Sequence, residues 1–142
     1  EMLGSLQECF ERTVDYLKER KQFGVAIGSF QALKHRAANM FCEIELSKSC
    51  VLEALTALEE DRDAEEVSKL ASLTKAKVGE TFNLVSREGI QMHGGIGMTD
   101  EFDIGFFIKI LDITISALLY SAEGAGSEKS CQMLIFRSRP GL

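Results

Sequence analysis

The segment QMHGGIGMTDEFD, residues 91–103, separates two long apolar stretches in a chain whose apolar residues otherwise recur at helical spacing. Three of its residues are glycines: Gly94, Gly95 and Gly97. The single proline of the 142 residues, Pro140, lies near the end, so no earlier position forbids a helix. The glycine segment therefore predicts a connection between two helices.

The apolar positions before the glycines predict three helices. The first covers about residues 2–20, and the second follows Ser29, whose hydroxyl can act as an N-cap by accepting a hydrogen bond from an orphan backbone N–H. The third begins at Asp63, which resembles a capping box together with Glu66. The apolar faces of the three helices are, in order, Leu3, Leu6, Phe10, Val14 and Leu17; Phe30, Leu33, Ala37, Phe41, Ile44, Val51, Leu55 and Leu58; and Val67, Leu70, Ala71, Val78, Phe82, Val85 and Ile90.

The segment after the glycines, residues 104–120, fits a helix or a strand, because it contains several β-branched isoleucines that partly alternate. No partner strand is expected elsewhere, and a lone strand would leave its backbone groups unpaired. We therefore expect a helix that begins near Asp103 and is buried on nearly all sides. The four helices predict an all-α fold, an antiparallel up-down four-helix bundle, as a single domain over residues 1–142.

Composition excludes several classes of function. A formal net charge of −6 argues against nucleic-acid binding, and the apolar segment contains Lys109 and Asp112 and is too short for a membrane span. Neither histidine follows a glutamate by three residues, as helical di-metal sites usually require, so we expect no metal. The cysteines form no CxxC pair, which favours reduced thiols and a cytoplasmic location: Cys9, Cys42, Cys50 and Cys131.

The glycine segment does not fit a dinucleotide-binding βαβ fingerprint, because the residues before it are helical. Two interpretations stay open: a plain turn, or a loop whose bare N–H groups approach phosphate oxygens. His93 fits either helix-end packing or a ligand contact. A second connection, ERKQFGVAIGSFQ (residues 19–31), places Arg20 and Lys21 at the end of the first helix, where cations suit the dipole.

Taken together, RKQFGVAIGSFQALKHRAANM and QMHGGIGMTDEFDIG resemble the two signature stretches of the C-terminal helical domain of acyl-CoA dehydrogenases. The resemblance covers about residues 2–110, with two antiparallel helices between the motifs. It implies a domain that follows a helical and a β-rich domain, both absent from this chain. It also implies an FAD-dependent α,β-dehydrogenation of acyl-CoA thioesters, electron-transfer flavoprotein as the electron acceptor, and a homo-oligomer (dimer or tetramer) with FAD between subunits.

The resemblance also assigns cofactor contacts. Arg20 matches the arginine that approaches the FAD pyrophosphate, and its guanidinium offers a directed fork to phosphate oxygens. Glycines in the second stretch admit the cofactor close to the backbone. The other matching positions are Gln22 and Phe23 beside the arginine, Gln31 near the adenosine, and Gln91, Gly94 and Gly95 in the second stretch.

The catalytic base of the family is harder to place. Many members carry it in a Glu-Gly-Thr sequence on the fourth helix, but an ungapped count from Gly95 falls on Leu118. Glu123, in Glu123-Gly124-Ala125, becomes the candidate base if a short insertion is accepted; other members place the base before the equivalent of Glu1. We expect the chain to be the C-terminal domain of such an enzyme, inactive alone and with weak or absent FAD binding by itself. The alternative is a stand-alone oligomerising bundle that has lost the cofactor chemistry.

Overall fold

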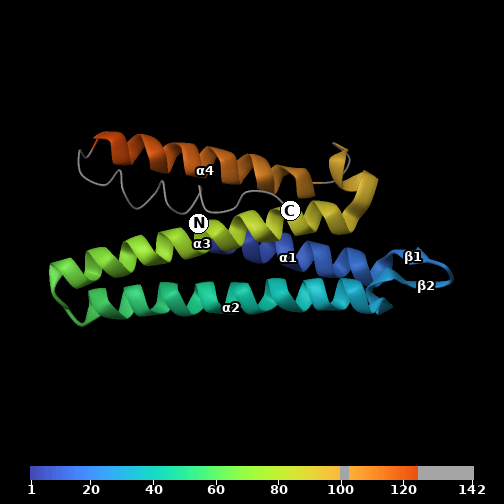
Figure 1. Ribbon diagram of the computed structural model, residues 1–142, viewed down its shortest axis with the longest axis horizontal. Coiled ribbons are helices and arrows are strands. Elements are labelled where there is room, and N and C mark those ends of the chain that lie inside the picture. The colour runs from blue at the N-terminus through green and yellow to red at the C-terminus, as the bar shows by residue number, and fades with distance from the viewer. Residues whose placement is uncertain (100–102, 125–142) are drawn as a thin grey trace.

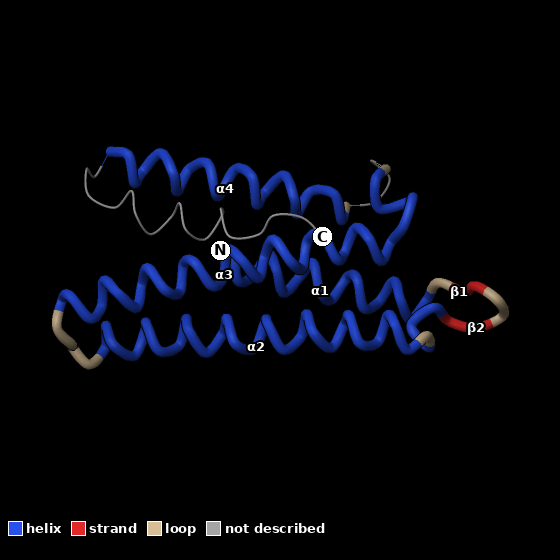
Figure 2. Tube along the Cα trace, viewed as in Figure 1, coloured by secondary structure: helices blue, strands red, loops and turns tan. Residues whose placement is uncertain are grey.

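The computed structural model describes residues 1–99 and 103–124, except for the side chains of Met98 and residues 115–124. Its main elements are the helices α1 (Met2–Glu19), α2 (Gln31–Glu59), α3 (Ala64–His93) and α4 (Ile104–Gly124). Consecutive helices run in opposite directions (Figures 1 and 2). The predicted all-α, antiparallel up-down bundle is confirmed.

The parallel helices α1 and α3 form the centre of the bundle, and α2 and α4 lie on opposite sides of this pair (Figure 1). The two central helices approach closely where α3 carries Gly89. A Cβ atom at Gly89 would lie 3.0 Å from Thr13 Oγ1 and 3.3 Å from Cys9 Sγ. Burial raises the pKa of Cys9 to about 12, so this core thiol stays protonated at neutral pH.

The segment Ile104–Gly124 forms a helix, α4, as expected. The prediction that it is buried on nearly all sides is wrong for the single chain. Ile104, Phe107 and Leu111 are buried at the three- and four-residue spacing of one helical face. Phe106 and Ile113, on other faces, are 52% and 69% exposed. Among the described residues, α4 packs against α1, α3 and η2, so the face toward these elements is buried while Phe106 and Ile113 on other faces stay exposed.

The second half of α2 also differs from the expected core. Leu55 and Leu58 were predicted to be inward-facing, yet they are 52% and 58% exposed. At about 1.5 Å per residue, α1 is about 27 Å long and α2 about 43 Å. Figure 1 shows α1 beside only one half of α2. The other half of α2 extends past the end of α1, and its leucines are exposed.

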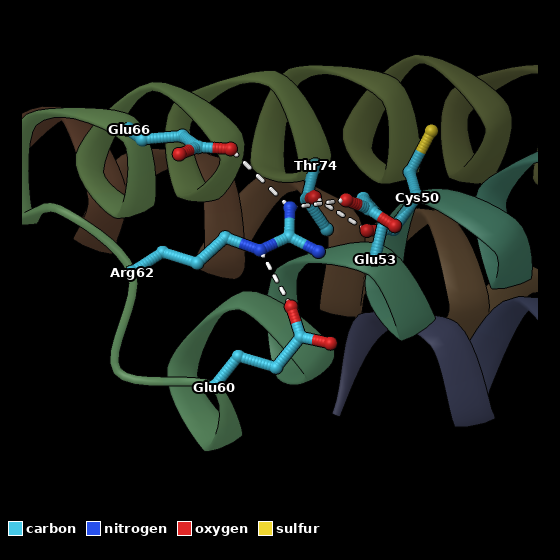
Figure 3. Close-up of polar contacts among 6 residues, drawn as sticks. All are labelled: Cys50, Glu53, Glu60, Arg62, Glu66 and Thr74. Atoms are coloured by element: carbon cyan, nitrogen blue, oxygen red, sulfur yellow. Dashed lines mark hydrogen bonds and ion pairs between the residues drawn. The ribbon is translucent and has the colours of Figure 1, made fainter.

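The α2–α3 junction is built around one arginine (Figure 3). The Arg62 guanidinium donates hydrogen bonds to Glu53 and Glu60 at 2.8 Å and to Glu66 at 3.2 Å. The predicted N-cap of α3 is confirmed, because an Asp63 carboxylate oxygen accepts from the Glu65 N–H at 3.1 Å. The capping box is not completed as predicted: the Glu66 side chain pairs with Arg62.

The α1–α2 connection contains a short antiparallel ribbon, β1 (Lys21–Gln22) and β2 (Val25–Ala26), followed by the 3₁₀ turn η1 (Ile27–Ser29). Phe23 and Gly24 make its tight turn with φ angles of 54° and 80°. The prediction that Ser29 caps α2 is wrong. Its hydroxyl donates to the Ala26 carbonyl at 2.7 Å, and α2 starts after Phe30 without a side-chain cap.

Candidate functional site

The two connections that the sequence singled out meet at one end of the bundle. Because α1 and α3 run in the same direction, their C-terminal ends bring the β1–β2 ribbon next to the 3₁₀ turn η2 (Gly94–Met98) (Figure 1). A pocket of about 330 Å³ lies between them. Its lining consists of Tyr16, Arg20, Gln22, Ile27, Met92, His93, Gly94, Gly95 and Ile96.

Four of the residues expected to contact the cofactor line this pocket: Arg20, Gln22, Gly94 and Gly95. Arg20 is the residue that directly follows α1, and Gly94 is the residue that directly follows α3. The up-down topology therefore joins two chain segments that are far apart in the sequence. The two motifs are therefore distant in the sequence but line the same pocket.

The remaining expected contacts lie outside the pocket lining. Phe23 is 91% exposed at the ribbon turn, where its ring meets the edge of Phe30 at a centroid distance of 6.3 Å. Gln31 is the exposed first residue of α2, and Gln91 is exposed in the last turn of α3. All three are exposed to a ligand that extends beyond the pocket.

The three glycines of the segment have different surroundings. Gly94 ends α3 with a φ of 66°, which strains any residue that carries a Cβ. A Cβ atom on Gly97 would lie 2.8 Å from both the His93 Cβ and the Ile90 carbonyl oxygen, so Gly97 allows η2 to fold back on α3. A Cβ atom on Gly95 would meet nothing within 4 Å. A Cβ atom on Gly94 would also meet nothing within 4 Å, so Gly94 and Gly95 both leave backbone open to an incoming group, whereas Gly97 does not.

Tyr16 and His93 form the inner side of the pocket. Their rings stack with a centroid distance of 4.2 Å and an interplanar angle of 22°, and the Tyr16 hydroxyl donates to the His93 carbonyl at 3.3 Å. His93 Nδ1 lies 2.7 Å from the Gly89 carbonyl oxygen; since a carbonyl only accepts, Nδ1 carries the proton. Burial lowers the pKa of His93 below its usual value, which favours the neutral ring.

The sequence left the role of His93 open and did not single out Tyr16 at all. One signal for Tyr16 was present: it precedes Arg20 by four residues, and residues at that spacing share a helical face. The pairing with His93 was not visible, because it depends on how closely α1 packs against α3.

The charge of the pocket comes mainly from a side chain. Both α1 and α3 end here, and helix C-termini carry partial negative charge, which disfavours a bound anion. Arg20 supplies a positive charge at this position, with Lys21 beside it in the sequence. The arrangement can therefore bind an anionic group between a guanidinium and open glycine backbone.

The candidate base Glu123 falls in the last turn of α4, and its side chain is outside the described residues. Helix α4 begins near the pocket end of the bundle and runs toward the opposite end (Figure 1). At 1.5 Å per residue, Glu123 lies roughly 28 Å along the helix from Ile104. The assignment of Glu123 as the base remains a prediction.

The described part of the chain offers neither a cluster of metal ligands nor a membrane-spanning helix. Among the side chains that the structure describes, up to residue 114, no group of three or more histidine, cysteine or acidic residues could hold a metal ion. No helix in the described part of the chain is long and apolar enough to cross a membrane. Cys9, Cys42 and Cys50 are free thiols, and Cys131 lies outside the described residues.

Residues 1–114 match the family model of the acyl-CoA dehydrogenase C-terminal domain. The chain belongs to the acyl-CoA dehydrogenase family. The resemblance inferred from the two motifs is thereby confirmed, and the matched residues include both sides of the pocket and the first half of α4.

Relatives within the acyl-CoA dehydrogenase family agree with this assignment. The acyl-CoA dehydrogenase IpdE2 of Mycobacterium tuberculosis is 37% identical over 109 residues, which cover 77% of this chain and 32% of the relative. Butyryl-CoA dehydrogenase from Megasphaera elsdenii superposes with a TM-score of 0.75 at 26% identity, over 80% of this chain and 29% of the other. The structure of an FAD-dependent dehydrogenase superposes with a TM-score of 0.72 at 26% identity, over 78% of this chain and 29% of the other. The chain thus spans about a third or less of each of these proteins.

Proposed function

We propose that this acyl-CoA dehydrogenase domain contributes part of an FAD-binding site and a subunit interface to an enzyme that dehydrogenates acyl-CoA thioesters at the α and β carbons. The observation that carries the proposal is the pocket that joins Arg20 to the backbone at Gly94 and Gly95. This combination of a guanidinium and exposed glycine backbone suits the pyrophosphate of a dinucleotide.

The pocket fits one part of FAD. Its volume of about 330 Å³ is at the low end for a small-molecule site, so it would take the pyrophosphate region and leave the rest of the cofactor outside. Arg20 would hold and orient the phosphate oxygens, and Gly95 would let the group approach the backbone. Gln22 lies at the rim, and the ribbon residue Phe23 is exposed beyond it. FAD itself, when bound, supplies the hydride acceptor.

The remaining parts of the reaction are proposed for a longer or assembled enzyme. This chain covers about a third or less of its relatives, and its described residues bring no carboxylate base into the pocket. We therefore expect the chain alone to show no dehydrogenation of acyl-CoA. Acyl-CoA substrate, electron-transfer flavoprotein, a homo-oligomeric state and a cytoplasmic location belong to the same proposal.

A second candidate function is a stand-alone oligomerising bundle without cofactor chemistry. It is favoured by the exposed leucines of α2, among them Leu52, Leu55 and Leu58, which are 66%, 52% and 58% exposed. Large apolar side chains in a cluster are typical of association surfaces. The two functions agree on self-association and differ on whether the Arg20 pocket binds FAD.

The deciding experiment is a titration of the chain with FAD, followed by calorimetry or fluorescence, in wild type, Arg20→Ala and Lys21→Ala. The two substitutions remove the same charge, but only Arg20 lines the pocket. A charge-assisted hydrogen bond contributes about 1.5–3 kcal/mol, so we expect Arg20→Ala to weaken binding by about ten- to a hundredfold. Lys21→Ala should change the affinity by less than about threefold.

Absence of FAD binding by the wild type at high concentration would contradict the proposed cofactor role and favour the stand-alone bundle. Equal losses in both variants would mean that the pocket attracts FAD only through overall charge. In the same preparation, acyl-CoA substrates with ferricenium as electron acceptor should give no turnover; measurable turnover would contradict the expected inactivity of the isolated chain.

A further inference from the structure

We propose that Tyr16 and His93 are positioning residues that hold the glycine turn at a fixed place opposite Arg20. This inference rests on the proposed function, because it assigns the pair a role at the same phosphate-binding pocket. The stack lies directly beneath the turn, since His93 is the last residue of α3 and Gly94 is the next one along the chain.

Helix α1 presents Arg12 and Tyr16 to this region at a four-residue step, and Arg20 directly follows the helix. Arg12 Nη1 donates to Asp103 Oδ2 at 3.1 Å, and its guanidinium lies 5.9 Å from the centre of the Phe107 ring. Tyr16 stacks on His93, and Arg20 lines the pocket. Two residues of α1 therefore contact the chain on either side of the glycine turn: Tyr16 contacts His93 before the turn, and Arg12 contacts Asp103 after it. Arg20, just past the end of α1, places its charge in the same pocket as the turn.

The contacts of His93 explain how the stack can control the turn. The His93 imidazole is held on α3 because its Nδ1–H donates to the Gly89 carbonyl at 2.7 Å. The backbone carbonyl of His93 accepts a hydrogen bond from the Tyr16 hydroxyl at 3.3 Å. A Cβ atom on Gly97 would lie only 2.8 Å from the Cβ of His93, so η2 packs directly on His93. A shift of His93 would therefore move both the start of the turn at Gly94 and the part of η2 above it.

The turn needs such support because its own sequence does not restrain it. Gly94 has a φ of 66°, and neither Gly94 nor Gly95 has a side chain that could pack against a neighbour. Glycine loses more conformational freedom on ordering than any other residue, so a loose turn would have to be ordered at the cost of cofactor affinity. The aromatic stack supplies the rigidity from outside the turn.

The test compares two aromatic contacts made by the same helix. Tyr16→Leu removes the stack, Tyr16→Phe keeps it and removes only the hydroxyl, and His93→Gln removes the stack from the other side. The matched control is Phe10→Leu, because Phe10 also makes an aromatic contact between helices but does not line the pocket. Its ring centre lies 6.2 Å from that of Phe41, with the two rings tilted by 38°. Each variant is measured for FAD affinity and for its thermal midpoint.

We expect Tyr16→Leu and His93→Gln to weaken FAD binding by about tenfold, whereas Tyr16→Phe stays within about twofold of wild type. Phe10→Leu should lower the thermal midpoint similarly but leave the affinity within about twofold. Amide hydrogen exchange without FAD gives a second measurement: residues 95–97 should exchange faster in Tyr16→Leu than in Phe10→Leu.

An unchanged affinity in Tyr16→Leu, or equal losses of affinity in Tyr16→Leu and Phe10→Leu, would overturn the positioning role. If the Tyr16→Leu chain does not fold, unchanged affinity and unchanged exchange in His93→Gln would overturn it instead. The Arg20→Ala variant separates the two proposals. If Arg20→Ala weakens binding and the stack variants do not, only the positioning role fails; if wild type does not bind FAD, both fail.

Discussion

At the scale of single residues, His93 shows how burial sets a charge state. The residue is 5% exposed, its ring stacks on Tyr16 of α1, and its Nδ1–H donates to the Gly89 carbonyl. Burial is the larger influence and lowers the pKa of His93, while the hydrogen bond raises it in part. The folded chain therefore binds a proton at His93 less readily than the unfolded chain does.

This difference predicts a pH dependence of stability. Above about pH 6.5 the ring is neutral in the folded and the unfolded state, so His93 contributes fully to stability. As the pH falls below that value, the unfolded state gains the proton first, and the free energy of unfolding decreases. For one titrating group, the free energy of unfolding cannot change by more than about 1.4 kcal/mol per pH unit. We expect the free energy of unfolding to fall between pH 6.5 and 5 more steeply in wild type than in His93→Phe, measured by urea denaturation. Parallel pH profiles would contradict this, since His35 remains in both proteins.

The assignment of individual residues shows where sequence reasoning stops. Arg20 was placed at a helix end from its position, and the structure puts it in the pocket lining. The only local signal for Tyr16 is its four-residue spacing from Arg20, and this spacing does not distinguish an aromatic residue that packs in the core from one that supports a site. Its partner His93 is distant in sequence, so only the packing of α1 on α3 reveals the pair.

At the scale of elements, the α2–α3 pair combines surface and buried polar contacts. The Arg62 junction is formed by carboxylates that are about half exposed, and exposed ion pairs of this kind contribute little. Inside the pair, Ser47 Oγ and Thr81 Oγ1 lie 2.8 Å apart, and both residues are fully buried. The buried hydroxyls should therefore matter more for stability than the more numerous surface contacts.

Ser47→Ala is expected to lower the free energy of unfolding by about 1–3 kcal/mol, because it leaves the Thr81 hydroxyl without its partner inside the bundle. The double variant Ser47→Ala/Thr81→Val removes both polar groups and should cost less than the sum of the two single variants. Chemical denaturation of the four proteins in a double-mutant cycle measures the difference. Strict additivity of the two losses would show that the hydroxyls do not interact.

The helix starts illustrate which element boundaries can be predicted. Asp63 caps α3 as its sequence pattern predicts: its carboxylate accepts from the Glu65 N–H and is not used by a turn before the helix. Ser29 has the right chemistry for a cap but is used by η1, whose hydrogen bond to Ala26 precedes the helix. A cap can be predicted from local sequence only where no other turn competes for its side chain.

At the scale of the whole molecule, the unequal lengths of the helices leave apolar surface uncovered. The half of α2 that α1 does not reach includes Leu52, Leu55 and Leu58, and Leu73 on α3 is also 58% exposed. Exposed apolar groups gathered on one part of a molecule favour association. This surface is the physical basis for expecting a dimer or tetramer.

We expect the wild-type chain to behave in light scattering as a species larger than its monomer mass of 15.7 kDa. Leu55→Glu/Leu58→Glu should shift it toward the monomer without unfolding α2, because glutamate forms helices well. Ser68→Glu/Ser72→Glu, at exposed positions on α3, makes the same change in charge and should leave the mass unchanged. A wild-type monomer, or dissociation by both double variants, would contradict this role of the leucines.

The sequence by itself determined the four helices, their order, the Asp63 cap and the two motifs that indicate the family, because periodicity and capping act within a few residues along the chain. It could not determine which apolar faces are covered, since that depends on the length of each neighbouring helix: α4 and the far half of α2 were expected to be buried and are partly open. The pocket itself was decided by tertiary structure. Parallel α1 and α3 bring Arg20, His93 and the glycine turn to one end of the bundle, and only their packing places Tyr16 against His93.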